Sequence, residues 1–421
     1  MSEVIKTYEE ELETKEGFKK TKIGWIPSNW SLKILDELGK IFTGGTPSTT
    51  NNLYWNGSTN WFTPSEISKS GKHVYESLRK ISKDGVKKSS ATLMPKGTII
   101  VCTRATIGDL AITTEESTTN QGFKSIYPHD SVDTEFLYYL IDSQKANLIR
   151  KSSGSTFLEL STTNFRRFKV AVPSLPEQQK IASILSDWDR AIENTQFLIN
   201  KLQLRKKGLT QQLLTGKTRL AGFNDEWKEV KLGDITDRIT KKNEELDDTV
   251  VTISAQRGFI KQEDFFNKRV ASSTLSGYYL IEKGDFAYNK SYSNGYPMGA
   301  FKRLDDFDKA VVTTLYICFS VKDNIDSDFL MNYFEGGLMV KNLMKIAQEG
   351  GRAHGLLNIG LNDFFNLKLT IPSKEEQAEI AKVVNTVDDE IKNYQDYLEQ
   401  LQAQKKGLMQ QLLTGKIRVK L

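Results

Sequence analysis

Two stretches of the chain place an apolar residue at every third or fourth position for more than thirty residues. The first runs from Ile181 to Leu213 and the second from Ile380 to Leu412. A spacing sustained near 3.5 residues is typical of a coiled-coil seam, which is narrower than the apolar stripe of a surface helix. The pattern therefore predicts two long helices, each of which needs an apolar partner.

The ends of both helices carry the expected signals. In each copy a serine that fits an N-cap follows a proline, a glutamate comes three residues later as in a capping box, and a glycine closes the helix. These residues are Ser174, Glu177 and Gly216 in the first copy, and Ser373, Glu376 and Gly415 in the second. About forty residues lie between the caps, or roughly 60 Å of helix.

The two stretches are copies of each other. Residues 172–220 and 371–419 align without a gap at an offset of 199, with 24 identities in 49 positions. A fainter repeat opens each unit, where Trp30 and Leu35 have the spacing of Trp227 and Leu232. The chain therefore consists of two copies of one unit, and each copy is a globular region followed by a long helix.

The repeat leaves the pairing of the helices open. An antiparallel pair would relate the two units by an approximate two-fold axis, whereas a parallel pair would need a long return connection, which the intervening globular region could provide. Lys206 and Lys405 interrupt the seam at the same place. Either their stems lie beside the seam with the ammonium groups in water, or they act as a device for register or partner binding.

The globular regions mix strand and helix signals. Residues 98–113 read as strand, turn and strand, and residues 136–151 have helical periodicity. In the second region, residues 249–255 and 310–320 read as strands, and residues 329–347 as a helix with a glycine pair. We predict an α+β fold: two globular domains separated by two long helices that pair as an antiparallel coiled coil, in a pseudo-two-fold repeat.

This reading divides the chain into five parts. They are an N-terminal arm (1–20), a first globular domain (21–171), the first long helix (172–220), a second globular domain (221–370), and the second long helix with a C-terminal tail (371–421).

The net charge of the chain adds little evidence about its binding partners. The chain has 421 residues with 58 Lys and Arg against 53 Asp and Glu. Residues 21–171 have a net charge of +6 and residues 221–370 one of −3, so binding of a polyanion must depend on local patches. Two cysteines and three histidines are too few for a disulfide framework or a zinc cluster. The first twenty residues lack the apolar core of a signal peptide, and no eighteen consecutive residues are apolar, so we expect a cytoplasmic protein.

Two polar stretches, 42–66 and 288–297, are loops of the kind that touch a ligand, and basic residues accompany them. Such side chains can hydrogen-bond base edges or hold phosphates, although each could equally be an ordinary solvated surface. The candidate nucleic-acid-binding residues are Thr43, Thr46, Thr63, Ser65, Lys69, Lys72, Arg104, Arg150, Lys151, Arg238, Lys241, Lys242, Gln256, Arg257, Asn289, Lys290, Tyr292, Asn294, Arg352 and His354. On the helices, the candidate partner-binding residues are Lys206, Lys207, Gln211, Gln212, Lys405, Lys406, Gln410 and Gln411.

Motifs for catalysis are absent from the sequence. The stretch TGKT at 215–218 suggests a phosphate loop, but Gln211 stands where the motif requires glycine, and the second copy has Ile417 in place of the magnesium ligand. There is no GxSxG, no HExxH and no Asn/Asp-Pro-Pro-aromatic tetrapeptide. We therefore expect no catalytic residues, no metal and no cofactor on this chain.

The repeated segments carry a family resemblance. PSLPEQQKIASIL with KKGLTQQLLTGK, and PSKEEQAEIAKVV with KKGLMQQLLTGK, together with the unit opening GWIPSNWSLKILDELGKIFTGGTPS, resemble the specificity (S) subunit of type I restriction–modification enzymes. The stretch 268–304 is also similar to a target-recognition domain of that family. The resemblance covers the chain from about residue 17 onward.

The resemblance implies a function and a set of partners. Each globular domain would be a target-recognition domain reading one half of a split sequence in double-stranded DNA, and the helix pair would set the spacer. The chain would assemble with modification subunits, which hold S-adenosylmethionine, and with restriction subunits, which use ATP and Mg²⁺, and would itself catalyse neither step. The alternatives are a two-headed scaffold that binds proteins rather than DNA and, disfavoured by the missing motifs, a self-sufficient DNA methyltransferase or nuclease.

Overall fold

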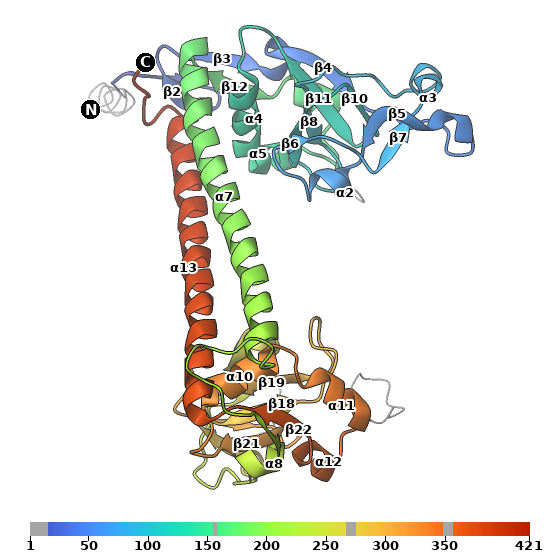
Figure 1. Cartoon of the computed structure of the whole chain (residues 1–421). Helices are drawn as coiled ribbons and strands as arrows, with labels where there is room; N and C mark the ends of the chain where they lie inside the picture. The colour runs from blue at the N-terminus through green and yellow to red at the C-terminus, as the bar shows by residue number, and fades with distance from the viewer. Residues whose placement is uncertain (1–15, 155–157, 267–274, 348–356) are drawn as a thin grey trace, which may run out of the picture. The chain divides into compact units, whose positions relative to one another are not determined.

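The computed structural model describes residues 16–154, 158–266, 275–347 and 357–421, and the chain divides into two compact units (Figure 1). The first unit is Met1–Thr195 together with Tyr397–Leu421, and the second is Gln196–Asp396. Each unit therefore holds one globular region and a part of both long helices.

The long helices α7 (Leu175–Leu213) and α13 (Lys374–Leu412) begin directly after the predicted caps, and each has 39 residues. Every seam position expected from the apolar spacing is buried or half-buried. In the first unit the start of α7 lies beside the end of α13, and in the second unit the start of α13 lies beside the end of α7. The helices are therefore antiparallel, as predicted, and the parallel alternative is excluded.

Both helices end three residues before the predicted glycines, which close the turn that follows each helix. Gly216 and Gly415 have φ values of +68° and +67°, a left-handed conformation that glycine adopts without strain. An aromatic ring at the opening of each unit packs on the glycine, so space is restricted as well. A Cβ added to Gly216 would lie 3.3 Å from Trp227, and one added to Gly415 would lie 3.3 Å from Trp30 and 2.3 Å from Pro27.

The glutamates at the helix starts do not play the part expected of them. Ser373 Oγ accepts the Glu376 amide at 3.4 Å, but the carboxylates bond to arginines instead of closing the capping boxes. Arg418 donates Nε and Nη2 to Glu177 at 2.7 and 2.8 Å. Arg219 donates in the same way to Glu376 at 2.6 and 2.7 Å. Each bidentate pair joins the start of one repeat copy to the end of the other.

The glutamine that follows each glutamate ties the helix to its globular region. Gln178 Oε1 accepts the Asp133 amide, and Gln377 Oε1 accepts the Asp326 amide, both at 2.9 Å. Asp133 and Asp326 are themselves the N-caps of α4 (Thr134–Ser143) and α10 (Ser327–Glu335). In both units, the repeated Glu-Gln dipeptide thus connects the start of the long helix to an arginine of the other repeat copy and to the N-cap of a short helix.

The lysines that interrupt the seam are paired across the helices. Lys206 Nζ lies 2.6 Å from Asp388 Oδ1, and Lys405 bonds to Asp189. Asp189 and Asp388 are 199 residues apart, as are the two lysines, so the pairs are equivalent by the repeat. Because the ammonium groups find a carboxylate on the facing helix, the register interpretation is favoured over simple solvation.

The first unit contains twelve strands and seven short helices. The strands are β1 (Phe18–Thr21), β2 (Gly24–Pro27), β3 (Ser31–Ile34), β4 (Gly39–Thr43), β5 (Trp55–Phe62), β6 (His73–Val74), β7 (Arg79–Ile81), β8 (Ile99–Cys102), β9 (Leu110–Thr113), β10 (Ser117–Thr119), β11 (Phe123–Pro128) and β12 (Lys169–Val172). The helices are η1 (Leu35–Glu37), η2 (Asn52–Tyr54), α2 (Pro64–Ile67), α3 (Lys83–Lys87), α4, α5 (Lys145–Arg150) and α6 (Thr162–Arg166). These counts refer to the residues that the structure describes.

The second unit is smaller. Its described strands are β13 (Lys228–Lys231), β14 (Thr236–Ile239), β15 (Val251–Ser254), β16 (Gly258–Lys261), β17 (Tyr279–Glu282), β18 (Phe286–Asn289), β19 (Ala300–Arg303), β20 (Lys309–Val312), β21 (Ile317–Val321) and β22 (Lys368–Ile371). Its short helices are α8 (Leu232–Ile235), α9 (Gln262–Phe266), α10, α11 (Val340–Ile346) and α12 (Leu361–Phe365).

Each unit contains its own sheet, and the two sheets have a common strand order that the sequences do not reveal. In the first unit the order is β4-β11-β8-β9-β6, and in the second it is β14-β21-β18-β19. The first four strands of one correspond to the four strands of the other, and all their pairings are antiparallel. Strands β8 and β9 form the predicted strand, turn and strand of residues 98–113.

Each sheet packs on its own apolar core. The core of the first unit includes Trp30, Phe136 and Phe165, none of which is exposed to solvent. The core of the second unit stacks phenylalanine rings, with Phe301 and Phe334 4.1 Å apart between centroids. The predicted helices 136–151 and 329–347 are each broken in two, the first at Gln144 and the second at the Gly336–Gly337 pair.

Candidate nucleic-acid interface

The stretch 42–66, predicted to be a loop, runs instead from the end of β4 through η2 and β5 into α2, and it holds four of the candidate residues. Thr43 is exposed at the end of the strand, while Thr46 donates its hydroxyl to Gln121 Oε1 at 2.6 Å. Thr63 caps α2 and bonds through its amide and hydroxyl to Glu66 at 2.8 and 2.6 Å. Ser65 is exposed beside it. Thr43 and Ser65 are therefore exposed to a ligand, whereas Thr46 and Thr63 form hydrogen bonds within the unit.

The tryptophans of this stretch hold the loop in place. Trp61 Nε1 donates to the Gly45 carbonyl at 2.9 Å, and Trp55 Nε1 donates to the Ser48 carbonyl at 3.0 Å. The rings meet edge to face with centroids 5.0 Å apart, and the guanidinium of Arg79 lies 3.6 Å from the Trp55 centroid. Both rings are buried, so they position the polar residues around them.

A charged group lies next to Thr43 on the sheet. Thr43 pairs with Lys124 across β4 and β11, and the Lys124 ammonium is 3.8 Å from Glu159, which binds Arg104 at 2.8 Å. Burial lowers the pKa of Lys124, against the attraction of Glu159. Arg104 is about half exposed, so the structure brings two predicted residues, Thr43 and Arg104, to one region.

The remaining candidates of the first unit are dispersed. Lys69 is exposed after α2. Lys72 is largely buried, at 2.7 Å from Glu135 and 3.2 Å from Asp189, and donates to the Tyr139 hydroxyl. An ammonium held by two carboxylates has an internal role, so we leave Lys72 out of the interface. Arg150 and Lys151 line a separate cavity at the end of α5.

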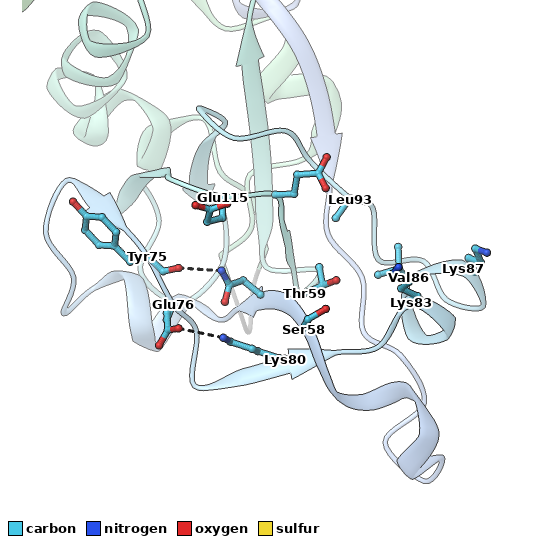
Figure 2. A pocket seen from close by; sticks show the side chains of 12 residues that line it. Ser58, Thr59, Tyr75, Glu76, Lys80, Lys83, Val86, Lys87, Leu93 and Glu115 are labelled. Carbon is cyan, nitrogen blue, oxygen red and sulfur yellow. Dashed lines mark hydrogen bonds and ion pairs between the residues drawn. The ribbon is translucent and has the colours of Figure 1, made fainter.

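A second cavity of the first unit escaped sequence reasoning. It encloses about 660 Å³ beside β5 and α3 (Figure 2). Asn60 donates to the Tyr75 carbonyl at 3.0 Å, and Lys80 lies 3.3 Å from Glu76. Lysines and glutamates both line it. The sequence did not predict this cavity, because its lining residues come from segments that lie apart in the chain, from Ser58 to Glu116.

In the second unit, basic residues follow β14. Arg238 is exposed on the strand. Lys241 lies 2.8 Å from Glu245, which also binds Lys309 at 2.7 Å. Hydrogen bonds from these two lysines lower the pKa of Glu245 to about 2. Lys242 donates to the Gly277 carbonyl at 2.8 Å and lies 4.4 Å from the centroid of the Tyr279 ring.

Two predicted segments of this unit meet in space. Gln256, in the turn between β15 and β16, donates to the Asn294 carbonyl at 3.0 Å. Arg257 and Asn294 are exposed there, and the Tyr292 side chain is 64% exposed. An amide, a guanidinium and an aromatic ring thus lie on one exposed surface, the groups that read base edges and stack on bases.

Two of the last four candidates, Asn289 and Lys290, lie at the end of β18, just before this loop. Asn289 Oδ1 accepts the Ser291 amide at 3.0 Å, and the Lys290 carbonyl accepts the Leu357 amide at 3.0 Å. Arg352 and His354 lie outside the described residues.

The candidate partner-binding residues occupy the C-terminal parts of the long helices. Lys207, Gln211 and Gln212 are exposed on α7, and on α13 Lys406 and Gln410 are exposed while Gln411 is half-buried. Lys405, Lys406 and Gln410 line a cavity of about 530 Å³ together with Asp142 and Asp189. Lys206 and Lys405 are engaged in the inter-helical ion pairs.

Within the described ranges, no group of three or more His, Cys, Asp or Glu is arranged to hold a metal ion, and no helix is long and apolar enough to cross a membrane. Burial raises the pKa of Cys102 and of Cys318 to about 12. Both thiols therefore remain protonated near neutral pH.

The chain matches a known family model twice. The model, described as the type I restriction modification DNA specificity domain, covers residues 27–204 and 224–403. The specificity subunit of the type I restriction enzyme MjaIX of Methanocaldococcus jannaschii is 38% identical over 234 residues, which are 52% of this chain and 54% of the relative. The EcoR124I/EcoR124II specificity subunit of Escherichia coli is 30% identical over 199 residues, 45% of this chain and 47% of the relative. The chain thus spans about half the length of these two relatives.

A solved structure shares the fold. The S subunit of a type I restriction–modification system from M. genitalium superposes with a TM-score of 0.54 at 16% identity, covering 93% of this chain and 97% of that chain. The likeness extends over both globular regions and both long helices.

Proposed function

The chain belongs to the type I restriction–modification DNA specificity family, and from this premise we propose that it is the DNA-reading subunit of a modification and restriction complex. The observation that carries the proposal is the tandem match of the specificity-domain model, once over each half of the chain. Each globular region then reads one half of a bipartite sequence in double-stranded DNA, and the helix pair sets the unread spacer between the halves.

The exposed polar side chains of each unit support a reading role. In the first unit, Thr43 and Arg104 lie in one region of the sheet, next to Lys124 and Glu159. In the second unit, Gln256 is joined to the loop of Asn294, with Arg257 and Tyr292 exposed. Arginine recognises guanine and glutamine or asparagine recognises adenine in the major groove. The two sets differ, so the two half-sites differ in sequence.

The long helices supply a surface for partner subunits. In the second unit the α7 side chains of Phe197 and Leu204 are 62% and 65% exposed, beside exposed Lys207, Gln211 and Gln212. Exposed apolar side chains on a helix otherwise rich in polar groups favour a docking interface. We assign this surface to modification subunits, which supply S-adenosylmethionine and the methyl transfer. Restriction subunits, with ATP and Mg²⁺, join that assembly, and this chain recognises DNA without catalysing either reaction.

Sequencing of methylated bases in host DNA tests the proposal. Deletion of this gene abolishes methylation at one bipartite motif, and return of the gene restores it. Substitution of Gln256 and Arg257 by alanine relaxes the bases of one half-site and leaves the other unchanged, since one lost bidentate contact costs about 1–3 kcal/mol of discrimination.

A matched control is the double substitution Lys283→Ala and Lys322→Ala, which alters two charges of the same unit outside the proposed interface. It leaves the motif unchanged. An unaltered methylation pattern after gene deletion would contradict the DNA-reading role and favour a scaffold that binds proteins.

A further inference from the structure

In a large cavity of the first unit, every charged residue of the lining is a cation. The cavity encloses about 900 Å³ between the β1–β2 hairpin, α5, β12 and the end of α13. Its charged residues are Lys22, Arg150, Lys151, Arg167 and Lys169, and no Asp or Glu contributes to its lining. Like charges around a concave surface focus a positive potential and attract an anion.

These cations lack carboxylate partners within the part of the chain that the structure describes. Arg150 donates to the neutral Asn147 side chain at 2.6 Å, and the other four form no ion pair there. The cavity of Figure 2, in the same unit, is electrically mixed, because it combines three lysines with three glutamates. The two other cavities described above for this unit, in contrast, include both carboxylates and lysines.

The repeat shows that the shared fold does not require this charge. The counterpart of Lys169, 199 residues later, is Lys368, and it lies 2.6 Å from Glu229 in the second unit. At the same offset, Asn366 replaces Arg167 and the acidic Asp363 replaces Asn164. The equivalent positions are thus neutralised in the second unit and remain cationic in the first. This difference indicates that the first unit binds a ligand there.

The remaining lining defines the ligand's chemistry. Trp25, Ile23, Phe168 and Leu413 contribute apolar surface to the cavity, and Ile23 is 45% exposed. DNA binds cations of this kind mainly through its phosphates, which would leave the apolar surface without a partner. An acidic peptide that also carries apolar side chains would satisfy both parts of the cavity.

We propose that the cavity binds the chain's own acidic N-terminal segment, residues 1–15. The segment has five glutamates and two lysines, and its apolar residues include Val4, Ile5, Tyr8 and Leu12. It leads into β1, whose hairpin partner β2 and connecting Lys22 form one wall of the cavity. A short tether gives such a segment a millimolar effective concentration at the cavity. Bound there, the glutamates screen the five cations from other polyanions, including DNA away from the reading loops.

Cross-linking in the full chain tests this contact. Glu10→Cys is combined with Lys169→Cys, and a short bis-maleimide is added in the absence of DNA and partner subunits. The native thiols do not interfere, because Cys102 and Cys318 are 0% and 1% exposed. We expect an intramolecular link between positions 10 and 169, identified by peptide mass spectrometry.

The control pairs Glu10→Cys with Lys87→Cys, which lies at the mixed-charge cavity. We expect it to link at least about tenfold more slowly. The link to position 169 weakens in 1 M salt, where the Debye length is about 3 Å, and when Glu9, Glu11 and Glu13 are replaced by glutamine.

Several results would overturn the proposal. They are equal rates for the two pairs, a rate that ignores salt and the glutamine substitutions, and links that form only between two copies of the chain. Protection of the Lys169→Cys thiol by a short DNA duplex but not by the acidic segment would assign the cavity to DNA. Because the link is measured on the free chain, its failure leaves the proposed reading of DNA untouched.

Discussion

Glu177 and Glu376 show how single residues join the repeat copies. Both are nearly fully buried, at 2% and 1% exposure, and each carboxylate is held by an arginine from the end of the other copy. A buried carboxylate without its partner is costly, because it keeps the desolvation penalty and loses the attraction. These pairs therefore stabilise the antiparallel arrangement only while both members are present.

Substitution Glu177→Ala is expected to lower the free energy of unfolding. Removing one member of a buried pair costs several kcal/mol, but Arg418 is 42% exposed, so we expect about 2 kcal/mol. Urea unfolding measures the loss, with Glu193→Ala, an exposed position on the same helix, as the control. The double variant with Arg418→Ala should lose little more than Glu177→Ala alone. Additive losses would mean that the two side chains do not interact.

Asp285 gives a pH dependence to the second unit. Burial raises the pKa of this carboxyl to about 6, although it accepts the Glu282 amide. The folded state then binds the proton more tightly than the unfolded state, so this group's contribution to stability falls as pH rises from about 4 to 6 and stays unfavourable above that range.

Substitution Asp285→Asn should remove this penalty. Near pH 3.5, ionisation should cause no difference in unfolding free energy between the variant and the unsubstituted chain. Above pH 6, the variant should gain about 1 kcal/mol relative to the unsubstituted chain, after allowing for partial exposure of the carboxyl. Unfolding measured from pH 3.5 to 8 checks this, and Asp248→Asn, at an exposed site, should give a flat difference. A difference that does not grow with pH would contradict the raised pKa.

The long helices show how similar residues act differently by position. Gly415 lies in the turn after α13 with positive φ, against Pro27 and Trp30, whereas Gly407 lies inside the helix with no neighbouring atom within 4 Å of an added Cβ. The first glycine permits a conformation and a close contact. The second only weakens the helix, because glycine has the larger entropy loss on folding.

Alanine at these two positions should therefore have opposite effects. Gly415→Ala is expected to destabilise the chain by about 2 kcal/mol, since an L-residue in the left-handed region costs roughly 1–2 kcal/mol before any clash. Gly407→Ala is expected to stabilise it by about 0.5–1 kcal/mol. Thermal and urea unfolding of both variants provide the measurement. Equal signs would contradict the different roles assigned to the two glycines.

For the whole molecule, the repeat determines which changes the helices can accept. The Lys206–Asp388 and Lys405–Asp189 pairs are equivalent by the repeat, as are the two bidentate pairs at the helix ends. An insertion between Glu177 and Asp189 of α7 alone cannot preserve both contacts of the first unit, because Lys405 and Arg418 keep their spacing on α13. Insertions between Asp189 and Lys206 and between Asp388 and Lys405 can, because they do not separate the contacts within either unit.

Insertion of one heptad between Asp189 and Lys206 of α7 and one between Asp388 and Lys405 of α13 is expected to lengthen the unread DNA spacer or to abolish recognition. Seven helical residues add about 10.5 Å, which corresponds to about three base pairs at 3.4 Å each. Sequencing of methylated bases reads the new motif. Insertion in α7 alone should lower the unfolding midpoint. An unchanged spacer in the doubly lengthened chain would refute the role of the helices as a ruler.

The sequence by itself determined the features that depend on neighbours along the chain. The 3.5-residue spacing predicted α7 and α13, and the terminal glycines and the strand, turn and strand at 98–113 were found from local propensity and turn chemistry. The repeat showed that two equivalent units exist, and the quoted segments indicated the family, which the comparisons confirmed. None of this required knowledge of contacts between distant residues.

The tertiary structure decided which distant residues meet. Glu177 and Arg418 are 241 positions apart, and nothing local predicts that a capping glutamate binds an arginine of the other copy. The sequence did not predict the four-stranded sheet common to both units, because many different sequences can form the same buried antiparallel sheet. Lys72 looked like an exposed cation until Glu135 and Asp189 were placed beside it, and Gln256 joined the 290–296 loop only through the fold. Short-range patterns reside in the sequence, whereas ion pairs, cavities and interfaces depend on a chain that has already folded back on itself.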